Sequence, residues 1–494
     1  MLLTVDLVAQ GVAGAQNVGS NDFCICEGPG DMRSVSLIDT VHRVRYGPLR
    51  QGSLTGPTYA SNINYLYQPV GTTYRIGVFF PDPGTTVTTM GVDLQLGGIA
   101  PGIPIVNDGT PVANLVAGGA DGTTAVAPSA ISTEGSASAP AGSTPSSTPA
   151  LGPSNISSPA STVTAATGGD HNGPLVTWPA LQPAANAYVD RHDLIAKVVG
   201  GTVNEGGNHK QGIVTLNADV LFAFNSAKLN AKAAALIRQA GSILNSKAEP
   251  SKPVTVIGYT DGKGDPSYNL SLSEKRADSV VKSLHNSRLT GLKLQSSGKG
   301  ESDPVAPNTK VDGSDSPRGR ALNRRVEITY QPKQGTTAIS TPTTSPSGIS
   351  ATHAPGAAAG AIDLPPATVK GNGVYPATMT ATVYPIIEDD TLSLVSIDVT
   401  ASHDTLLIDA FSSRSKADQD IGIFTITDPA TKRVYLPAYD ADNSYRIMGT
   451  YTHRLTAGQP LHFAFYAAEL PATLGTATVD LDQLGTAKSV RISR

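Results

Sequence analysis

Cysteine is nearly absent from this chain of 494 residues, which contains only Cys24 and Cys26. A disulfide between cysteines one residue apart would be strained, so no disulfide framework is predicted. No second cluster of cysteine or histidine completes a zinc site. We expect two small side chains in a loop or at a strand edge, with a redox or metal-binding role as the alternative, and no cofactor.

Charged and aromatic residues are also sparse, at 15% and 5% of the sequence. The net charge of −4 gives the chain no electrostatic reason to bind nucleic acid or an acidic membrane. Lysine-rich runs and interleaved basic and aromatic residues are missing as well. The sequence therefore predicts no nucleic-acid partner.

Long apolar runs are a third absence. No stretch of about 20 apolar residues occurs, so no transmembrane segment is predicted. Residues 1–10 (MLLTVDLVAQ) have no basic region before their apolar run, and Asp6 interrupts that run. They make a poor signal peptide by these criteria, and we interpret them as a β-strand.

Glycine and proline are plentiful, with 50 and 36 residues respectively. Two segments, residues 107–186 and 333–372, are rich in Ala, Ser, Thr, Gly and Pro. Such sequence buries too little apolar surface to offset its ordering entropy, so both segments are predicted to be linkers. They divide the chain into three modules at residues 1–106, 187–332 and 373–494.

The two outer modules resemble each other. Landmarks recur in them with the same order and spacing: Asp39 and Tyr46 with Asp428 and Tyr435, Gly71 and Val92 with Gly458 and Val479, residues 74–80 with 461–466, and residues 3–7 with 395–399. A duplicated domain explains this agreement better than chance composition does.

Both copies consist of short alternating runs broken by Gly, Pro and Asp. This pattern predicts all-β modules, and an immunoglobulin-like sandwich is the natural closure for about 100 residues. Residues 375–387 add a strand to the second copy for which the first copy has no room. We therefore expect the first copy to be clipped, with an upstream segment that carries an export signal as a hypothesis.

The central module alternates strand-like and helix-like patterns in the order β-α-β-α-β-β. Apolar residues at helical spacing follow Leu229, with Asn230 as the predicted N-cap. A second helix is expected to begin near residues 271–273, where Ser271 and Glu274 have the spacing of a capping box. Strands are expected at residues 213–222, 252–259, 292–297 and 325–330. This order predicts an α+β domain with its helices on one face of the sheet.

Many residues of this module match a known signature in order. The matches are Leu221–Asn225, Ser226, Leu229, Gly258–Asp261, Gly264, Tyr268–Asn269, Leu272–Ser273, Arg276–Ala277, Val280, Gly298–Gly300, Pro304, Gly319–Arg320 and Asn323–Ile328. Together they resemble the C-terminal domain family of OmpA, Pal and MotB, with a core at residues 212–332. The resemblance implies binding to the peptide stem of peptidoglycan through diaminopimelate, with Asp261 and Arg276 as the two contacts.

The chemistry of the ligand suits these two residues. The far end of diaminopimelate carries an ammonium and a carboxylate on one carbon, so Asp261 suits the ammonium and the planar fork of Arg276 suits the carboxylate. We expect Arg276 in the first turn of its helix, where free backbone N–H groups also favour an anion. Lysine stems lack this carboxylate, which supplies discrimination. Without the resemblance, an ion pair between the two residues would be the simpler interpretation.

Further candidates are expected either to contact the ligand or to position the loop. They are Asn225, Thr260, Gly264, Asn269, Leu272, Ser273, Asn323, Arg324 and Arg325. Asn225 stands where many relatives have Asp, which puts a direct role for it in doubt. The basic strip at residues 323–325 either touches the glycan–peptide surface or pairs with Glu327 and neighbouring acids.

These features predict a non-enzymatic protein of the bacterial cell envelope that binds peptidoglycan without a covalent bond. The envelope location is an expectation that the poor signal peptide leaves unexplained. One alternative is an adhesin or assembly scaffold whose β-sandwich modules hold a protein partner. The other alternative is a wall-acting enzyme whose site is assembled from distant residues.

Overall fold

The computed structural model describes much of the three predicted modules and several short strands. The described residues are 1–8, 35–53, 58–60, 73–84, 86–94, 98–105, 186–309 (without 288 and 290), 314–333, 377–407, 424–441 and 457–494 (without 459, 482 and 483), with short strands at 16–18, 62–63, 66–68, 124–125, 161–164, 176–178, 362–363, 367–369 and 453–455. Cys24 and Cys26 lie outside these residues. Most of the two predicted linkers does too.

The chain divides into two compact units, each described by itself. The first comprises Met1–Val35, Gly47–Asp82 and Val106–Asp190, and the second comprises Ser36–Tyr46, Pro83–Ile105 and Arg191–Arg494. The strands of the first unit are β1 (Leu2–Val8), β2 (Gln16–Val18), β5 (Asn62–Ile63), β6 (Leu66–Gln68), β7 (Thr73–Phe79), β10 (Thr124–Ala125), β11 (Ser161–Thr164) and β12 (Val176–Trp178). The module boundaries drawn from the linkers stay a prediction.

The central domain, in the second unit, is an α+β fold on a five-stranded sheet. Its elements are β15 (Val203–Gly207), β16 (Gly212–Asn217), α2 (Ala218–Leu221), α3 (Ala233–Lys247), β17 (Pro253–Gly258), α4 (Pro266–His285), β18 (Lys293–Gly298), α5 (Pro317–Asn323) and β19 (Arg325–Tyr330). The strands lie in the order β15, β16, β19, β17, β18. The pair β17 and β18 is parallel, and the other neighbours are antiparallel.

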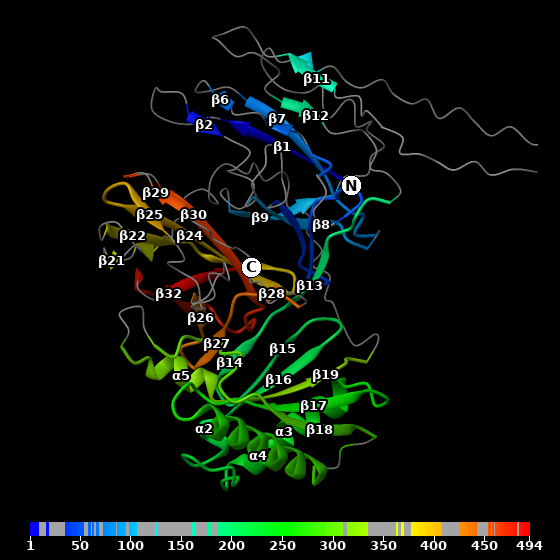
Figure 1. Cartoon of the computed structure of the whole chain (residues 1–494), viewed down its shortest axis with the longest axis vertical. Helices are drawn as coiled ribbons and strands as arrows, with labels where there is room; N and C mark the ends of the chain where they lie inside the picture. The colour runs from blue at the N-terminus through cyan, green and yellow to red at the C-terminus, as the bar shows by residue number, and fades with distance from the viewer. Residues whose placement is uncertain are drawn as a thin grey trace, which may run out of the picture. The chain divides into compact units, whose positions relative to one another are not determined.

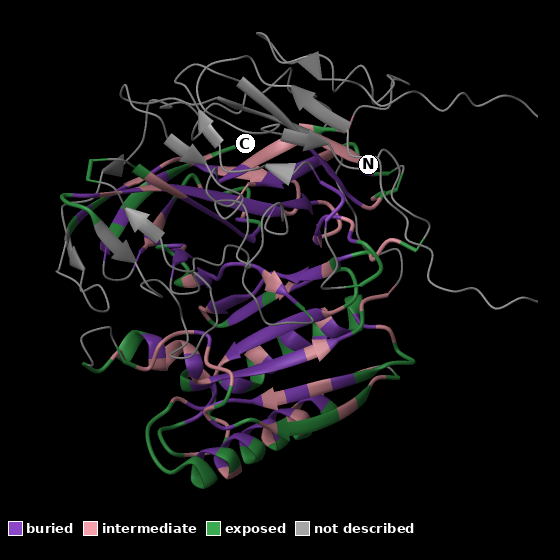
Figure 2. Ribbon diagram, turned by 45° about the horizontal axis from the view of Figure 1, so that its top comes forward, coloured by how far each residue is buried: buried purple, intermediate pink, exposed green. Residues whose placement is uncertain are grey.

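Helices α3 and α4 lie along one face of this sheet (Figure 1). Successive side chains of a strand point to opposite faces, so only alternate residues meet the helices. Val326 and Ile328 of β19 belong to the core under the helices. Arg325 and Glu327 are buried on the opposite face. The outward sides of the helices are exposed (Figure 2).

Helix α4 begins earlier than the sequence analysis predicts. The side chain of Asp265 caps it by accepting hydrogen bonds from two backbone N–H groups of the first turn, at 2.9 and 3.1 Å. Pro266 takes the first helical position, where its missing N–H costs nothing. The predicted capping box of Ser271 and Glu274 is therefore wrong, because this Asp-Pro start precedes it.

Four further elements differ from the prediction. Helix α3 begins at Ala233, although Asn230 still holds the turn before it by accepting from the N–H groups of Lys232 and Ala233 at 2.9 and 3.1 Å. Residues 218–221 form the short helix α2 instead of continuing a strand. Strand β15 and helix α5 were not predicted, because each is short and has weak periodicity.

The remaining elements of the second unit are strands. They belong to the two outer copies or to the short run of β13 and β14 at residues 191–200, which pairs with both copies. They are β3 (Ser36–Asp39), β4 (Val44–Tyr46), β8 (Thr89–Asp93), β9 (Ile99–Pro104), β13 (Arg191–Ile195), β14 (Val198–Gly200), β20 (Ile362–Asp363), β21 (Ala367–Val369), β22 (Ala377–Val383), β23 (Ile386–Asp389), β24 (Leu392–Ala401), β25 (Thr405–Leu407), β26 (Thr425–Thr427), β27 (Arg433–Tyr435), β28 (Tyr439–Asp440), β29 (His453–Leu455), β30 (Pro460–Ala468), β31 (Thr476–Asp480) and β32 (Thr486–Ser493). The chain outside the central domain is therefore rich in β-sheet.

Equivalent strands of the two copies pair in the same register. Leu37 of β3 lies opposite Val92 of β8, just as Ile426 of β26 lies opposite Val479 of β31. The strand pairs β1–β7 and β24–β30 also have the same register. In both pairs, the residues that lie opposite each other occupy equivalent positions in the two copies. The structure therefore repeats the spacings seen in the sequence.

Local irregularities recur at equivalent positions as well. Each copy has a register shift in the ladder that follows, between Met90 and Val92 and between Ala477 and Val479. Positive φ angles occur in matched pairs of residues, which are Arg43 and Lys432, Gly98 and Gly485, and Gly102 and Ser489. Because such backbone conformations are uncommon outside glycine, their agreement supports a common origin of the copies.

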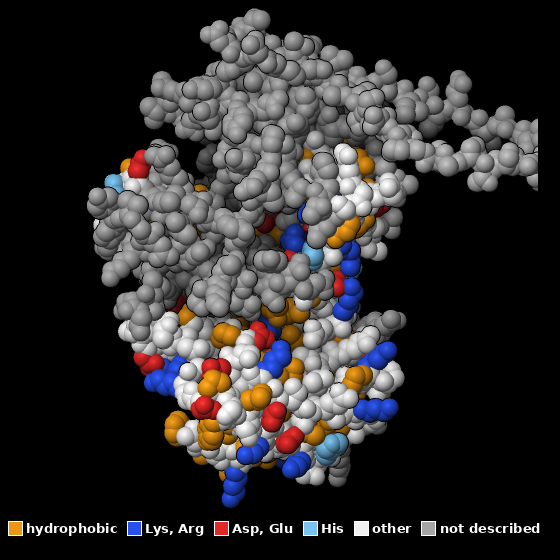
Figure 3. All heavy atoms as spheres, in the orientation of Figure 1, with side chains coloured by type: hydrophobic (Ala, Val, Ile, Leu, Met, Phe, Trp, Pro, Cys, Tyr) orange, Lys and Arg blue, Asp and Glu red, His pale blue; other side chains and the backbone are white. Residues whose placement is uncertain are grey.

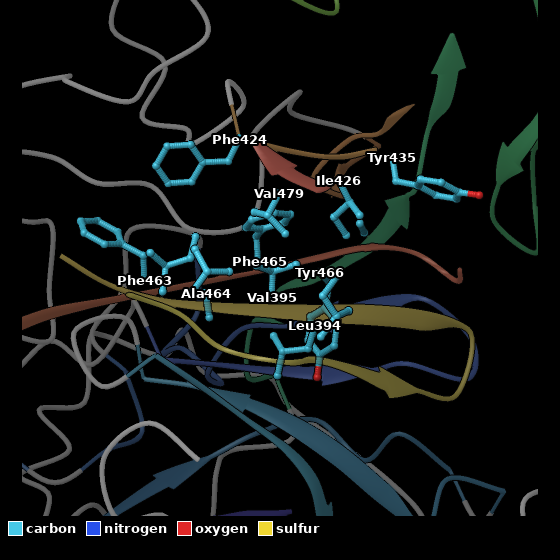
Figure 4. Packing of buried hydrophobic residues seen from close by; sticks show 14 of the residues in the cluster. Leu394, Val395, Phe424, Ile426, Tyr435, Phe463, Ala464, Phe465, Tyr466 and Val479 are labelled. Atoms are coloured by element: carbon cyan, nitrogen blue, oxygen red, sulfur yellow. The ribbon is translucent and has the colours of Figure 1, made fainter. Parts of the chain in front are cut away.

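One short run of chain serves both copies. Strand β13 pairs with β4 of the first copy, and β14 pairs with β27 of the second. Arg191 lies opposite Tyr46 and Val198 lies opposite Tyr435, which are equivalent tyrosines. The second copy also supplies a large apolar core, in which the rings of Phe424 and Phe465 lie 6.5 Å apart (Figure 4).

We expect Gly258→Ala to destabilise the central domain by about 1–3 kcal/mol. A Cβ at this position would lie 2.1 Å from the backbone oxygen of Ser273, so β17 and α4 would have to separate. Hydrogen exchange of the β17 and α4 amides measures the effect. The control is Gly475→Ala, which has no atom within 4 Å, and equal exchange in the two variants would contradict the prediction.

Candidate functional site

Asp261 lies in the loop that follows β17, among basic side chains. Its Oδ1 accepts a hydrogen bond from the backbone N–H of Lys263 at 3.1 Å. Its Oδ2 pairs with Nη1 of Arg324 at 2.5 Å, and Nε of Arg320 lies 3.6 Å away. The carboxylate is therefore held in place from two sides, with part of its surface open to solvent.

Arg276 lies on α4 near this carboxylate and is only 5% exposed. Its Nε donates to the backbone oxygen of Ser226 at 3.0 Å, and its guanidinium lies over the ring of Phe222 at 5.2 Å. Burial lowers the pKa of Arg276 below its usual value, and the charge of Asp219 opposes that shift. These contacts fix the side chain, and its two Nη atoms form no hydrogen bond with the residues that the structure describes.

The expected place of Arg276 in the first turn of its helix is wrong, because α4 begins at Pro266. Free N–H groups and the helix dipole act within the first turn, so they do not assist Arg276. Within the described parts of the chain Arg276 forms no ion pair, so the simple pairing of Asp261 with Arg276 is not what the structure contains. Each of the two charges has its own separate support.

The loop between β17 and α4 is held by Asn269 and Ser273. Nδ2 of Asn269, which is 4% exposed, donates to Glu301 Oε2 at 2.7 Å and to the backbone oxygen of Lys263 at 3.1 Å. Oγ of Ser273 donates to the oxygen of Leu270 and accepts from the N–H of Gly300 at 2.9 Å. Both side chains are occupied by the protein, which favours loop positioning over ligand contact.

Four other candidates lie around the same loop. Gly264 has φ +105°, which a residue with a side chain would adopt only under strain. Leu272 is buried, and the hydroxyl of Thr260 is buried without a hydrogen-bond partner among the described residues. Asn225 is exposed at φ +53°, a conformation that Asn tolerates better than most residues.

The basic strip of residues 323–325 divides into three separate roles. Asn323 is buried and binds the loop ahead of α5, accepting from Val305 N–H at 2.9 Å and donating to the oxygen of Ala306 at 2.8 Å. Arg324 bridges Asp219 and Asp261, which raises its pKa. Only Arg324 of the three therefore faces the candidate site.

Arg325 is buried on the other face of the sheet. Its Nε pairs with Glu327 at 2.7 Å, and its guanidinium lies 3.7 Å from the centre of the Tyr259 ring. Lys197 also approaches Glu327, at 3.3 Å. The charges of Lys197 and Arg325 outweigh the effect of burial and lower the pKa of Glu327 to about 2. Arg325 therefore pairs with Glu327, which is the second interpretation of the basic strip given above.

Asp219 and Arg320 were not among the predicted site residues. Asp219 lies in the first turn of α2 and reaches Arg324 at 2.7 Å, which no sequence spacing indicates. Arg320 is one of the residues that match the family signature, so the resemblance could have indicated it as a site residue. Basic and acidic side chains lie close together on the visible face of this domain (Figure 3).

Residues 221–317 match the model of the OmpA family. The chain contains an OmpA-like domain. Domains of the OmpA, Pal and MotB kind associate with peptidoglycan, and their parent proteins belong to the cell envelope. The match lies on the central module, where the resemblance was noted.

Parts of the chain are similar to curated proteins and to solved structures, and the match to outer membrane protein A agrees with this assignment. The chain is 39% identical over 159 residues to photosystem I P700 chlorophyll a apoprotein A2 of Gloeobacter violaceus, which covers 32% of this chain and 17% of that protein. It is 40% identical over 121 residues to outer membrane protein A of Escherichia fergusonii, covering 23% of this chain and 48% of that protein. A solved structure, the peptidoglycan-associated lipoprotein from Burkholderia pseudomallei, is 27% identical with a TM-score of 0.19, covering 25% of this chain and 90% of that one. The chain thus spans less than half of the two curated relatives.

Two features are absent from the residues that the structure describes. No helix there is both long and apolar enough to cross a membrane. Across the same ranges, no group of three or more His, Cys, Asp or Glu side chains is arranged to hold a metal ion.

We expect Glu327→Gln to lower the free energy of unfolding of the central domain by about 3–5 kcal/mol at pH 7, because Arg325 and Lys197 would remain buried without their anion. The folded pKa of about 2 lies below the ordinary 4.5, so this stabilisation is complete above pH 4.5 and is lost as the pH falls towards 2. Urea unfolding of wild type and variant at several pH values measures it.

Glu205→Gln is the control, since Glu205 pairs with Lys247 where both side chains are about half exposed. It should change stability by less than about 1 kcal/mol. A difference between Glu327→Gln and wild type that persists undiminished at pH 2 would contradict the prediction.

Proposed function

We propose that this protein binds diaminopimelate-containing peptidoglycan without a covalent bond and is thereby anchored in the cell envelope. The observation that carries the proposal is that Asp261 lies close enough for its charge to act on Arg276, while the two form no ion pair among the described residues. Each has separate support from the protein, and each keeps a charged group for a ligand. A ligand that carries an ammonium and a carboxylate on one carbon suits such a site.

The two contacts have different tasks. Asp261 accepts the ammonium at the far end of diaminopimelate, where Arg324 already fixes the orientation of the carboxylate. Arg276 donates its two Nη groups to the neighbouring carboxylate in a planar fork. Its stacking on Phe222 and its bond to Ser226 hold this fork before the ligand arrives, which reduces the entropy lost on binding.

The remaining candidates act on this pair indirectly. Asn269, Ser273 and Gly264 shape the loop that carries Asp261. A stem with lysine in place of diaminopimelate leaves Arg276 without its anion, and burying an unpaired charge is costly. Affinity for diaminopimelate stems over lysine stems follows from this cost.

The outer copies complete the proposal. We infer that each closes as an immunoglobulin-like sandwich, at predicted boundaries 1–106 and 373–494. The matched registers of the two copies favour a second candidate function, a scaffold or adhesin that presents two similar surfaces to a protein partner. In either case the protein is proposed to act by binding and not as an enzyme.

We expect Asp261→Asn and Arg276→Lys each to weaken binding to diaminopimelate peptidoglycan by about 10–100-fold, because each removes a charge-assisted hydrogen bond. Asp261→Asn keeps the size of the side chain and Arg276→Lys keeps its charge, so neither change adds bulk to the fold. Co-sedimentation of the full chain with purified sacculi measures the effect.

The matched controls are Asp278→Asn and Arg238→Lys, which alter exposed residues of α4 and α3. They should bind as wild type does. Undiminished binding by both site variants would contradict the proposal. Clearing of a peptidoglycan zymogram by the purified protein would instead favour the wall-acting enzyme.

A further inference from the structure

Arg320 has one hydrogen-bond donor without an acceptor. Its Nη1 pairs with Asp315, but its Nε lies 3.6 Å from Asp261 Oδ2, beyond the length of a hydrogen bond. This Nε is shielded from solvent and has no hydrogen-bond partner in the part of the chain that the structure describes. A buried donor without an acceptor costs free energy, so such groups point to a missing partner.

Thr260 has a similar deficit one residue before Asp261. Its side chain is 5% exposed, and its Oγ1 has no partner among the described residues. Its backbone N–H is satisfied by the oxygen of Gly300 at 2.8 Å, so only the hydroxyl is unpaired. Two buried polar groups near Asp261 thus lack hydrogen-bond partners among the described residues.

The proposed ligand head does not remove this deficit. Its ammonium binds Asp261, and its carboxylate binds Arg276, which leaves the Nε of Arg320 unpaired. The ammonium also adds a positive charge beside Arg320 and Arg324, which already lie at 3.6 and 2.5 Å from the Asp261 carboxylate. A second anion near the two arginines offsets this repulsion.

We propose that the site also binds a second free carboxylate of the peptide stem, one residue away from diaminopimelate, through Arg320 with Arg324 beside it. The inference rests on the proposed function. Two positions of a stem can offer this chemistry: the residue before diaminopimelate, a γ-linked D-glutamate whose α-carboxylate is free, and the residue after it, a C-terminal D-alanine. Conversion of that carboxylate to a carboxamide removes the charge that the arginines bind.

The test uses three synthetic stem peptides that contain diaminopimelate and differ in one group. In the first both carboxylates are free, in the second the glutamate is amidated, and in the third the C-terminus is amidated. We expect one of the two amidations to weaken binding to the full chain by about 10-fold in isothermal titration calorimetry. The peptide that loses affinity identifies the source of the carboxylate.

Variants assign the effect to Arg320. Arg320→Gln should bind the free and amidated peptides within about twofold of each other, since it lacks the charge that distinguishes them. Arg320→Lys keeps the charge but loses Nε and should give an intermediate ratio. The exposed Arg238→Gln on α3 is the matched control and should keep the full ratio.

The outcomes separate this inference from the proposed function. Equal affinity of wild type for all three peptides, or an unchanged ratio in Arg320→Gln, would show the inference to be wrong while diaminopimelate binding stands. Failure of wild type to bind even the peptide with both carboxylates free would overturn the proposed function and this inference together. Because the first comparison uses wild type alone, a variant that folds poorly does not prevent a decision.

Discussion

The buried contact of Arg325 with Glu327 is the interaction on which the ligand site depends. It fixes the start of β19, and the side chain before it, Arg324, is directed towards Asp219 and Asp261. The carboxylate proposed to bind an ammonium is thus oriented by a strand whose own position relies on a desolvated ion pair. Taking these charges out of water is expensive, which makes the geometry of the pair demanding and its loss severe.

Much of the central domain could be predicted from the sequence, because its helices and strands are long and periodic. The strand at residues 325–330 and the sheet with helices on one face agree with the structure. The start of α4 differs from the prediction because two start signals compete in the sequence. The capping-box spacing indicates a later start, whereas the helix begins at the Asp265-Pro266 pair. Short elements such as α5 carry too little periodicity to be recognised.

The candidate site was predictable only in part, for a physical reason. Family resemblance named Asp261 and Arg276, but the partners of Asp261 are Arg320 of α5 and Arg324 directly after it, far along the chain. Ion pairs depend on distance in space, and spacing in sequence carries no record of it. In the outer copies the reverse holds, since repeated spacings in the sequence correspond to repeated ladder registers.

The shared run of β13 and β14 has a consequence for the order in which the chain is synthesised. Strand β4 is synthesised long before its partner β13, so its edge stays unpaired until then. Strand β14 is likewise synthesised long before its partner β27. Strand edges left open during synthesis are templates for pairing with the wrong strand. Because β4 and β27 are equivalent, the competing structure is one in which β14 occupies the edge of β4. The sequences of β13 and β14 therefore carry information that keeps two nearly identical sites distinct while the protein folds.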